Sequence, residues 1–174
     1  VTLIGMGGSI LGAKAIYNFL EPNFKKFIFV DNISNFTQKP VKKNINLIIS
    51  KSGNTLETIS NSNTLINKRS LNIFLTEKKQ SYLTEIANKL KAEIIHHNNY
   101  IGGRYSVLSE VGMLPAQLMG LKPEKFRRFN KLIKKKSFVN SLIQNVSSTL
   151  MMTKKNITNS VILNYDLRSN DLFS

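Results

Sequence analysis

Five short apolar segments recur along the first hundred residues, each rich in isoleucine, leucine, valine or phenylalanine. Each is short enough for a β-strand, and its nearly continuous apolar character is typical of a strand buried on both faces. The predicted strands are residues 1–4, 27–30, 47–49, 71–75 and 93–95. Because a strand recurs roughly every 20 to 25 residues, each interval leaves room for the crossover helix that parallel strands require. The spacing therefore predicts a parallel sheet.

Helical periodicity fills several of these intervals. The predicted helices are residues 10–20, 55–68 and 81–90. In the last of them, Leu83, Ile86 and Leu90 fall on one stripe of an amphipathic helix. The segment 31–43 is less regular, and Pro40 is expected to end any helix there. The alternation of strands and helices predicts a three-layer α/β/α sandwich around a five-stranded parallel sheet.

After about residue 106 the pattern becomes helical. Further helices are predicted for residues 107–119, 123–136 and 138–153, and a last short strand for residues 161–163. Pro123 suits a first helical turn, since its missing N–H is not needed there. We find no internal repeat, low-complexity linker or clear domain boundary. The sequence therefore predicts a single domain over residues 1–174, with a helical extension from about residue 107.

The charge balance is strongly positive, with 25 Lys and Arg against 10 Asp and Glu, a net charge of +15 and a pI near 10.1. Such a balance attracts polyanions or small phosphorylated ligands. An abundance of lysine, asparagine and isoleucine is also what a drift towards AT-rich codons produces without any partner. The basic segment 122–136 fits either a nucleic-acid surface or a solvated helix face. We expect the solvated face, and no nucleic-acid partner.

Cysteine is absent, which excludes disulfides and thiolate metal sites and fits a reducing compartment. Residues 1–20 are apolar, but glycines interrupt them and they lack a basic leader. Neither a signal peptide nor a membrane span is therefore expected. These features predict a soluble, cytoplasmic protein.

The first predicted strand runs into GMGGSILG, residues 5–12. Ligands bind at the carboxyl ends of parallel strands, where helix N-termini present free N–H groups. Gly7 and Gly8 permit a close backbone approach at this place, and Ser9 offers a hydroxyl. The motif matches neither the dinucleotide pattern GxGxxG nor the nucleotide P-loop. By itself it predicts a candidate phosphate cradle.

The third predicted strand runs into SKSGNTLET, which begins at Ser50. Ser50, Ser52 and Thr55 can each present a hydroxyl to an anion at the start of the next helix, and Lys51 adds a positive charge. The competing interpretation is an N-cap at Asn54. In that case a glutamate three residues later, Glu57, completes a capping-box-like pair. Because a cap needs one side-chain oxygen and this loop supplies three hydroxyls and a lysine, we favour anion binding.

The fifth predicted strand runs into NNYIGGRYSVLSEVG, residues 98–112. Paired glycines, Gly102 and Gly103, bring the backbone close to a ligand, and the Arg104 guanidinium can offset developing negative charge on oxygen. A buried ion pair of Arg104 with a neighbouring helix is the alternative. Two glycines would be superfluous for such a pair, so we favour the ligand-binding role.

Taken together, GMGGSILG, SKSGNTLET and GGRYSVLSEVG resemble the sugar-phosphate-binding half of the phosphoglucose isomerase family. The predicted sheet resembles the flavodoxin-like sugar isomerase (SIS) domain of that family. By this resemblance the substrate phosphate is held around Gly8, Ser9, Ser50, Ser52 and Thr55. The reacting end of the sugar is lined by Lys51, Glu57, Gly103 and Arg104. The catalytic residues expected in this chain are Arg104, Glu57 and Lys51.

The resemblance implies interconversion of glucose 6-phosphate and fructose 6-phosphate, as in glycolysis and gluconeogenesis, through a cis-enediol intermediate. It implies no metal and no redox cofactor, and a homodimeric full-length enzyme. The general-base glutamate, the ring-opening histidine and a further lysine of the family are expected beyond the matched segment, and NYDLRSNDLFS resembles the link to a second domain. The chain is therefore expected to be a fragment that recognises phosphate and carries part of the catalytic machinery.

Two histidines, His96 and His97, follow the fifth predicted strand and match no motif of the family. We interpret them as ordinary strand-end residues. Glu57 is interpreted as an orienting partner of Lys51 or Arg104. The alternative to an isomerase is a sugar-phosphate-sensing SIS module that performs no chemistry.

Overall fold

The computed structural model describes residues 1–22, 26–33 and 44–172 of the chain. The chain divides into two compact units, Val1–Leu121 with Arg168–Ser174, and Lys122–Leu167. The first unit contains the sheet and its loops, and the second is helical. The single domain expected over residues 1–174 stays a prediction, and the segment 34–43 with Pro40 lies outside the described residues.

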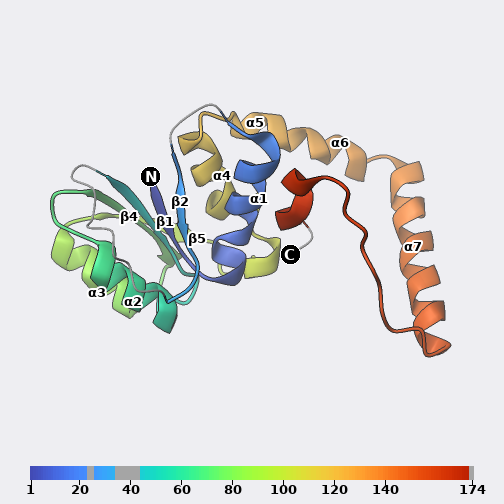
Figure 1. Cartoon of the computed structure of the whole chain (residues 1–174), viewed down its shortest axis with the longest axis horizontal. Coiled ribbons are helices and arrows are strands. Elements are labelled where there is room, and N and C mark those ends of the chain that lie inside the picture. Colours follow the sequence, from blue (N-terminus) through green and yellow to red (C-terminus); the bar gives the residue numbers. More distant parts are fainter. Residues whose placement is uncertain (23–25, 34–43, 173–174) are drawn as a thin grey trace. The chain divides into compact units, whose positions relative to one another are not determined.

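The first unit is built on a five-stranded parallel sheet (Figure 1). Its strands are β1 (Thr2–Ile4), β2 (Ile28–Val30), β3 (Ile45–Ile49), β4 (Leu71–Glu77) and β5 (Glu93–His97). They lie in the order β2-β1-β3-β4-β5, and all neighbours pair in parallel. The direction of winding reverses between β1 and β3, which is where such sheets open a ligand crevice at the strand carboxyl ends. All five predicted strands are confirmed.

Helices cover both faces of the sheet (Figure 1). One face carries α1 (Leu11–Leu20) and α4 (Glu110–Leu118), and the other carries α2 (Leu56–Leu65) and α3 (Tyr82–Leu90). The predicted three-layer α/β/α sandwich is thus confirmed. Helix α4 begins later than expected, because the hydroxyl of Ser109 accepts a hydrogen bond from the Val111 N–H and caps the helix at that point.

The continuous apolar strands supply two separate cores. Successive strand residues point to opposite faces of a sheet. Leu3 and Leu47 accordingly belong to the cluster beneath α1 and α4, whereas Ile4 and Ile48 belong to the cluster beneath α2 and α3. All four side chains are fully buried. A strand buried on both sides has no polar face, which explains why these strands lack an alternating pattern.

The second unit contains α5 (Pro123–Phe126), the 3-10 turn η3 (Arg127–Phe129), α6 (Asn130–Ile133) and α7 (Lys136–Lys154). The single helix predicted for residues 123–136 is therefore a series of short helical segments, and extended backbone at Lys135 (φ −84°, ψ 115°) separates it from α7. The strand predicted for residues 161–163 is wrong, because a strand requires a hydrogen-bonding neighbour and this segment pairs with no described strand. Among the described residues, no helix is long and apolar enough to cross a bilayer.

Candidate functional site

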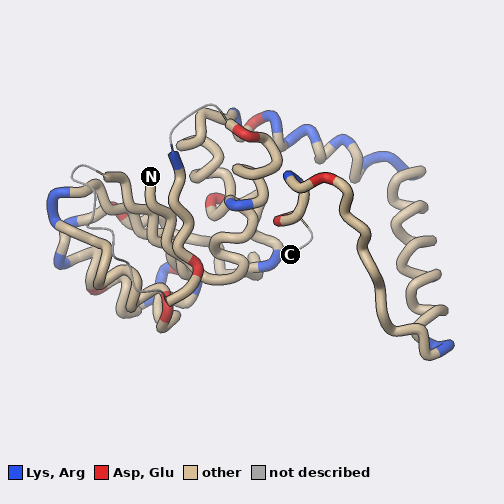
Figure 2. Tube along the Cα trace, viewed as in Figure 1, with Lys and Arg blue, Asp and Glu red and all other residues tan. Residues whose placement is uncertain are grey.

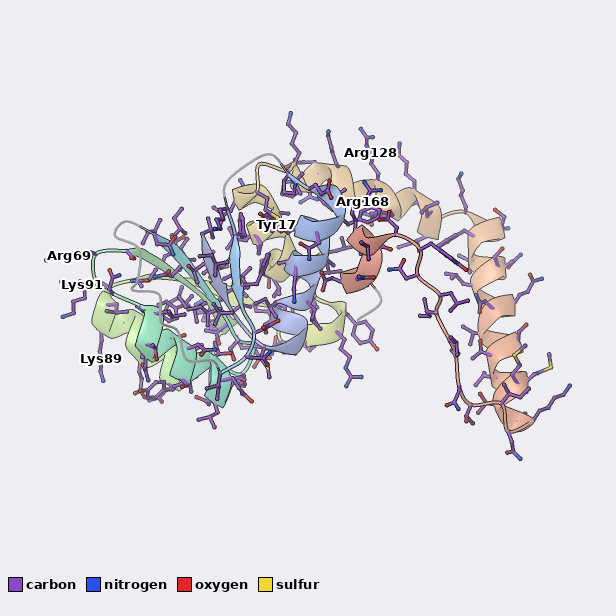
Figure 3. All side chains as sticks on the ribbon, in the orientation of Figure 1. Tyr17, Arg69, Lys89, Lys91, Arg128 and Arg168 are labelled. Atoms are coloured by element: carbon purple, nitrogen blue, oxygen red, sulfur yellow. The ribbon has the colours of Figure 1, made fainter. Side chains whose placement is uncertain are left out.

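The loops after β1, β3 and β5 meet at the carboxyl edge of the sheet, as expected for parallel strands. The opposite edge carries Arg69, Lys89 and Lys91, whose exposed side chains point away from the body of the unit (Figure 3). These basic residues lie before β4 and β5, far from the motif loops. The candidate site is therefore confined to the carboxyl edge.

The backbones of the first and third motifs touch at Gly8 and Gly103. A β-carbon on Gly8 would lie 2.4 Å from the carbonyl carbon and oxygen of Gly103, which no side chain tolerates. The hydroxyl of Ser106 donates to the Gly103 carbonyl at 2.6 Å and lies 3.3 Å from the Gly8 carbonyl oxygen. The 3-10 turns η1 (Gly7–Ser9) and η2 (Gly103–Tyr105) are thereby joined. Glycine at position 8 is thus a packing requirement.

The buried Ser50 side chain holds the loop of the second motif by hydrogen bonds. Its side chain is 1% exposed, and its hydroxyl shares a hydrogen bond of 2.9 Å with the Thr55 hydroxyl. The N–H of Gly53 donates to the same Ser50 oxygen at 3.2 Å. Gly53 has a φ of +67°, and a β-carbon there would lie 2.1 Å from the Ser81 hydroxyl oxygen. Ser50 therefore shapes the loop from inside.

The competing interpretation of this loop as a capping box is wrong. The N-cap of α2 is Thr55, and its side chain makes no capping hydrogen bond. The Asn54 side-chain oxygen instead accepts from the Tyr82 N–H at 2.9 Å, at the start of α3. Glu57 lies in the first turn of α2, and within the described part of the chain its carboxylate makes no hydrogen bond or ion pair. The orienting role of Glu57 stays a prediction.

An open cavity of about 360 Å³ lies over this loop, and we call it the serine–lysine recess. Its lining residues are Ser9, Lys51, Ser52, Thr55, Glu77 and Lys79. The first four are residues that the sequence predicted, and they come from the ends of β1 and β3. The structure thus brings three hydroxyls, two ammonium groups and the Glu77 carboxylate to one small space. Such a donor set is suited to an anion with several oxygen atoms.

Glu77 and Lys79 were missed by the sequence analysis, although TEKK directly after an apolar strand is a visible signal. Lys79 Nζ lies 2.9 Å from one Glu77 oxygen, and Lys51 Nζ lies 3.4 Å from the other. The hydrogen bond from Lys79 lowers the pKa of Glu77 and outweighs the effect of burial, with a smaller contribution from Lys51. Glu77 therefore stays ionised and holds both ammonium groups beside the recess.

Lys51 is also held by the loop after β5. Its ammonium donates to the carbonyl oxygen of Asn99 at 2.8 Å and to that of Ile101 at 2.9 Å. Together with Glu77, these contacts tie the ends of β3, β4 and β5. The Lys51 ammonium has a defined position before any ligand arrives, which reduces the entropy cost of binding.

Arg104 lines a second cavity of about 370 Å³, which we call the arginine recess, together with Gly8, Gly103, Val107 and Leu172. The Arg104 side chain is exposed, and it forms no ion pair or hydrogen bond in the described residues. The alternative of a buried ion pair is therefore wrong. The guanidinium is available to a ligand.

One contribution to the arginine recess could not be seen in the sequence. The turn η4 (Leu167–Leu172) packs against α1, where the Asn18 amide donates to the Asp171 carboxylate. Lys14 Nζ lies 3.9 Å from the same carboxylate. These contacts join residues more than 150 positions apart. Leu172 thereby becomes part of the recess wall.

The fold and its strand-end loops define a doubly wound α/β protein whose carboxyl edge gathers hydroxyl and ammonium groups. A family model described as phosphoglucose isomerase matches residues 1–159, and the chain belongs to that family. The resemblance inferred from the three motifs is confirmed.

Curated relatives agree with this assignment. The glucose-6-phosphate isomerase of Methanocaldococcus jannaschii is 38% identical over 135 residues, which cover 70% of this chain and 33% of that protein. The Mycoplasma genitalium enzyme of the same name is 34% identical over 142 residues, covering 71% of this chain and 33% of that protein. The chain therefore spans about a third of the length of these relatives.

Among solved structures, a hypothetical protein from Thermus thermophilus superposes with a TM-score of 0.75 at 24% identity. The superposition covers 98% of this chain and 45% of the other. At this identity the similarity shows the fold alone.

Proposed function

We propose that this chain forms the sugar-phosphate-binding part of a glucose-6-phosphate isomerase. The proposal is supported by its family and by the names of its curated relatives. The single observation that carries it is the serine–lysine recess, where hydroxyl and ammonium groups from separate loops converge. Since the match covers only 33% of that relative, the activity is proposed for the enzyme of which this chain is a part.

The substrate phosphate would occupy the serine–lysine recess. Ser9, Ser52 and Thr55 supply hydroxyls, and Lys51 supplies an ammonium group. Because the side chain of the N-cap residue Thr55 makes no capping hydrogen bond, the first N–H groups of α2 and the positive end of its dipole can also act on the phosphate. Ser50 contributes indirectly by shaping the loop, and Gly8 by allowing the close approach of the two motifs.

The sugar end of the substrate would extend to Arg104, Gly103, Glu57 and Lys51. Isomerisation removes the proton at C2 and delivers a proton to C1, through a cis-enediol with developing negative charge on oxygen. The free guanidinium of Arg104 is suited to stabilising that charge. Glu57 would orient a cationic neighbour. We assign the general base to no residue of this chain.

We further propose that the enzyme acts as a homodimer in the cytoplasm. The homodimer is suggested by the family. The cytoplasm is suggested by the absence of cysteine, which fits a reducing compartment. Sedimentation of the full-length enzyme would test the dimer.

Calorimetric titration of this chain tests the proposed function. Glucose 6-phosphate should bind, and free glucose should not. Ser52→Ala should weaken glucose 6-phosphate binding about tenfold, since it removes one hydrogen bond to a charged group. Exclusive binding of a DNA duplex would contradict the proposal. If the complete enzyme bound glucose 6-phosphate but produced no fructose 6-phosphate, the sugar-phosphate-sensing alternative would hold instead.

A further inference from the structure

His97, the last residue of β5, is almost fully buried, with 4% of its surface exposed. Its ring makes two polar contacts inside the first unit. Nδ1 lies 2.5 Å from the Oε1 atom of Glu110, the first residue of α4. Nε2 lies 3.2 Å from the carbonyl oxygen of Ile101. His96, its neighbour in the sequence, is exposed and makes no such contacts in the described residues.

Both ring nitrogens of His97 face oxygen atoms, one of the Glu110 carboxylate and one of the Ile101 carbonyl. A carbonyl oxygen only accepts hydrogen bonds, and so does an ionised carboxylate. A neutral imidazole has one N–H and can satisfy only one of these acceptors. Both contacts are satisfied when both ring nitrogens carry protons. When Glu110 is ionised, an imidazolium at His97 is the form that satisfies both contacts.

Several contacts keep Glu110 ionised. Burial raises the pKa of Glu110, but hydrogen bonds from its own N–H, from His97 and from the Asn98 N–H together lower it below the usual value. The Asn98 N–H donates to Oε1 at 3.1 Å. Glu110 thus binds one end of the loop 98–101, and His97 binds the other end.

This loop provides the carbonyl groups that hold Lys51. The Ile101 carbonyl oxygen that faces His97 also accepts a hydrogen bond of 2.9 Å from Lys51 Nζ, and the Asn99 carbonyl accepts another of 2.8 Å. If His97 were neutral and kept its bond to Glu110, the Nε2 lone pair would face the Ile101 oxygen. The loop would then shift and carry the Lys51 ammonium with it.

The charged groups around His97 come from three directions. Glu110 faces it from α4, and Lys51 reaches the same carbonyl from the end of β3. Glu77 is the β4 residue in register with His97, and it pairs with Lys51 and Lys79. His97 therefore lies at one end of a continuous polar chain that leads into the serine–lysine recess.

We propose that His97 and Glu110 are positioning residues that, as an imidazolium–carboxylate pair, hold the loop 98–101 and thereby place the Lys51 ammonium in the serine–lysine recess. The part that concerns sugar phosphate rests on the proposed function, whereas the protonation of His97 and the position of Lys51 do not. Sugar-phosphate affinity should accordingly depend on a histidine that never touches the ligand.

Nitrogen-15 NMR of the chain tests the pair without any ligand. We use a His96→Gln background, so that His97 supplies the only ring signals. At pH 7.0 both ring nitrogens of His97 should carry protons. The Lys51 ammonium should give a slowly exchanging signal because of its two carbonyl bonds. Adding Glu110→Gln should leave one ring proton and broaden the Lys51 signal. A singly protonated His97 at pH 7.0, or an unchanged Lys51 signal in Glu110→Gln, would overturn the proposal.

A binding measurement tests the consequence for the ligand. Glucose 6-phosphate is titrated calorimetrically at pH 7.5, where its phosphate is almost fully ionised because its second pKa is about 6. Glu110→Gln and His97→Gln should bind about tenfold more weakly than the unmodified chain. The control His96→Gln should behave as the unmodified chain does.

The two hypotheses fail in different ways. A Glu110→Gln protein that is folded by circular dichroism, yet retains the affinity of the unmodified chain, would contradict the positioning role. If the unmodified chain bound no glucose 6-phosphate, the proposed function would fail, and the NMR signals of His97 and Lys51 would still test the positioning role.

Discussion

Gly8 and Gly103 lie in direct backbone contact, but the contact tolerates a side chain on only one of them. A β-carbon on Gly8 would lie 2.4 Å from the Gly103 carbonyl, whereas a β-carbon on Gly103 would meet nothing nearer than the Gly8 Cα at 3.8 Å. The clash at Gly8 involves main-chain atoms, which cannot rotate away as a flexible side chain can.

Gly8→Ala should therefore destabilise the chain, and Gly103→Ala should not. We expect Gly8→Ala to lower the free energy of unfolding by about 2–3 kcal/mol, as overpacking does. Gly103→Ala should change it by less than about 0.5 kcal/mol. Urea denaturation of the two variants measures both values. Equal losses would show that the two loops do not meet in this way.

Substitution of the two serines of the second motif should have different effects. Ser50→Ala should lower stability, and Ser52→Ala should weaken ligand binding. Ser50→Ala removes a buried hydroxyl that bonds both Thr55 and the Gly53 N–H, so the free energy of unfolding should fall by about 1–2 kcal/mol. Ser52 is exposed, and Ser52→Ala should leave stability nearly unchanged while weakening glucose 6-phosphate binding. Thermal denaturation and calorimetry on the same samples compare them. Loss of stability in Ser52→Ala with intact binding would reverse these assignments.

Arg104 should stabilise the enediolate intermediate more than it stabilises the bound substrate. Arg104→Met removes the guanidinium but keeps much of the side-chain volume. We expect a planar anionic analogue of the enediolate to bind about 100-fold more weakly, and glucose 6-phosphate less than about tenfold more weakly. Inhibition of the full-length enzyme by the analogue provides the measurement. Equal losses for both ligands would assign Arg104 to general substrate binding.

The ion pairs of Glu77 with Lys51 and Lys79 should stabilise the folded chain at neutral pH, and this stabilisation should be lost in acid. Because its two lysines lower the pKa of Glu77, the stabilisation is present above the unfolded value near 4.5 and disappears as pH falls through the folded-state pKa. The lysines are partly exposed, so Glu77→Gln should cost only about 0.5–1 kcal/mol at pH 7. Urea denaturation from pH 7 to pH 3 should show the two proteins converging. A constant difference would indicate a packing effect.

The basic segment 122–136 should have no part in sugar-phosphate binding. Its lysines and arginines extend from Lys122, before α5, to Lys136, the first residue of α7 (Figure 2). They belong to the unit that does not contain the recesses. The double substitution Lys131→Glu with Lys134→Glu should leave glucose 6-phosphate affinity unchanged. Any DNA affinity should fall steeply with added salt, as expected of non-specific phosphate contacts. Salt-resistant binding to a DNA duplex would indicate a dedicated nucleic-acid surface.

Local sequence determined the elements of the first unit. Apolar runs predicted all five strands, and the glycine-, serine- and arginine-bearing loops directly after them contained most residues that line the two recesses. These predictions succeeded because side-chain periodicity and strand-end position are local properties. The strand predicted for residues 161–163 failed because pairing depends on a neighbouring strand, which no local pattern reveals.

Tertiary structure decided which side chains act together. The sheet order places the end of β4 between those of β3 and β5, so Glu77 can hold Lys51 while the loop after β5 supplies its carbonyl partners. The same arrangement made His97, which ends β5 as expected, a buried partner of Glu110. Sequence alone thus determined the strands and the polar and glycine-rich loops that follow them. Only the folded sheet decided which of those ends became neighbours, because contacts between distant residues arise from strand order and packing.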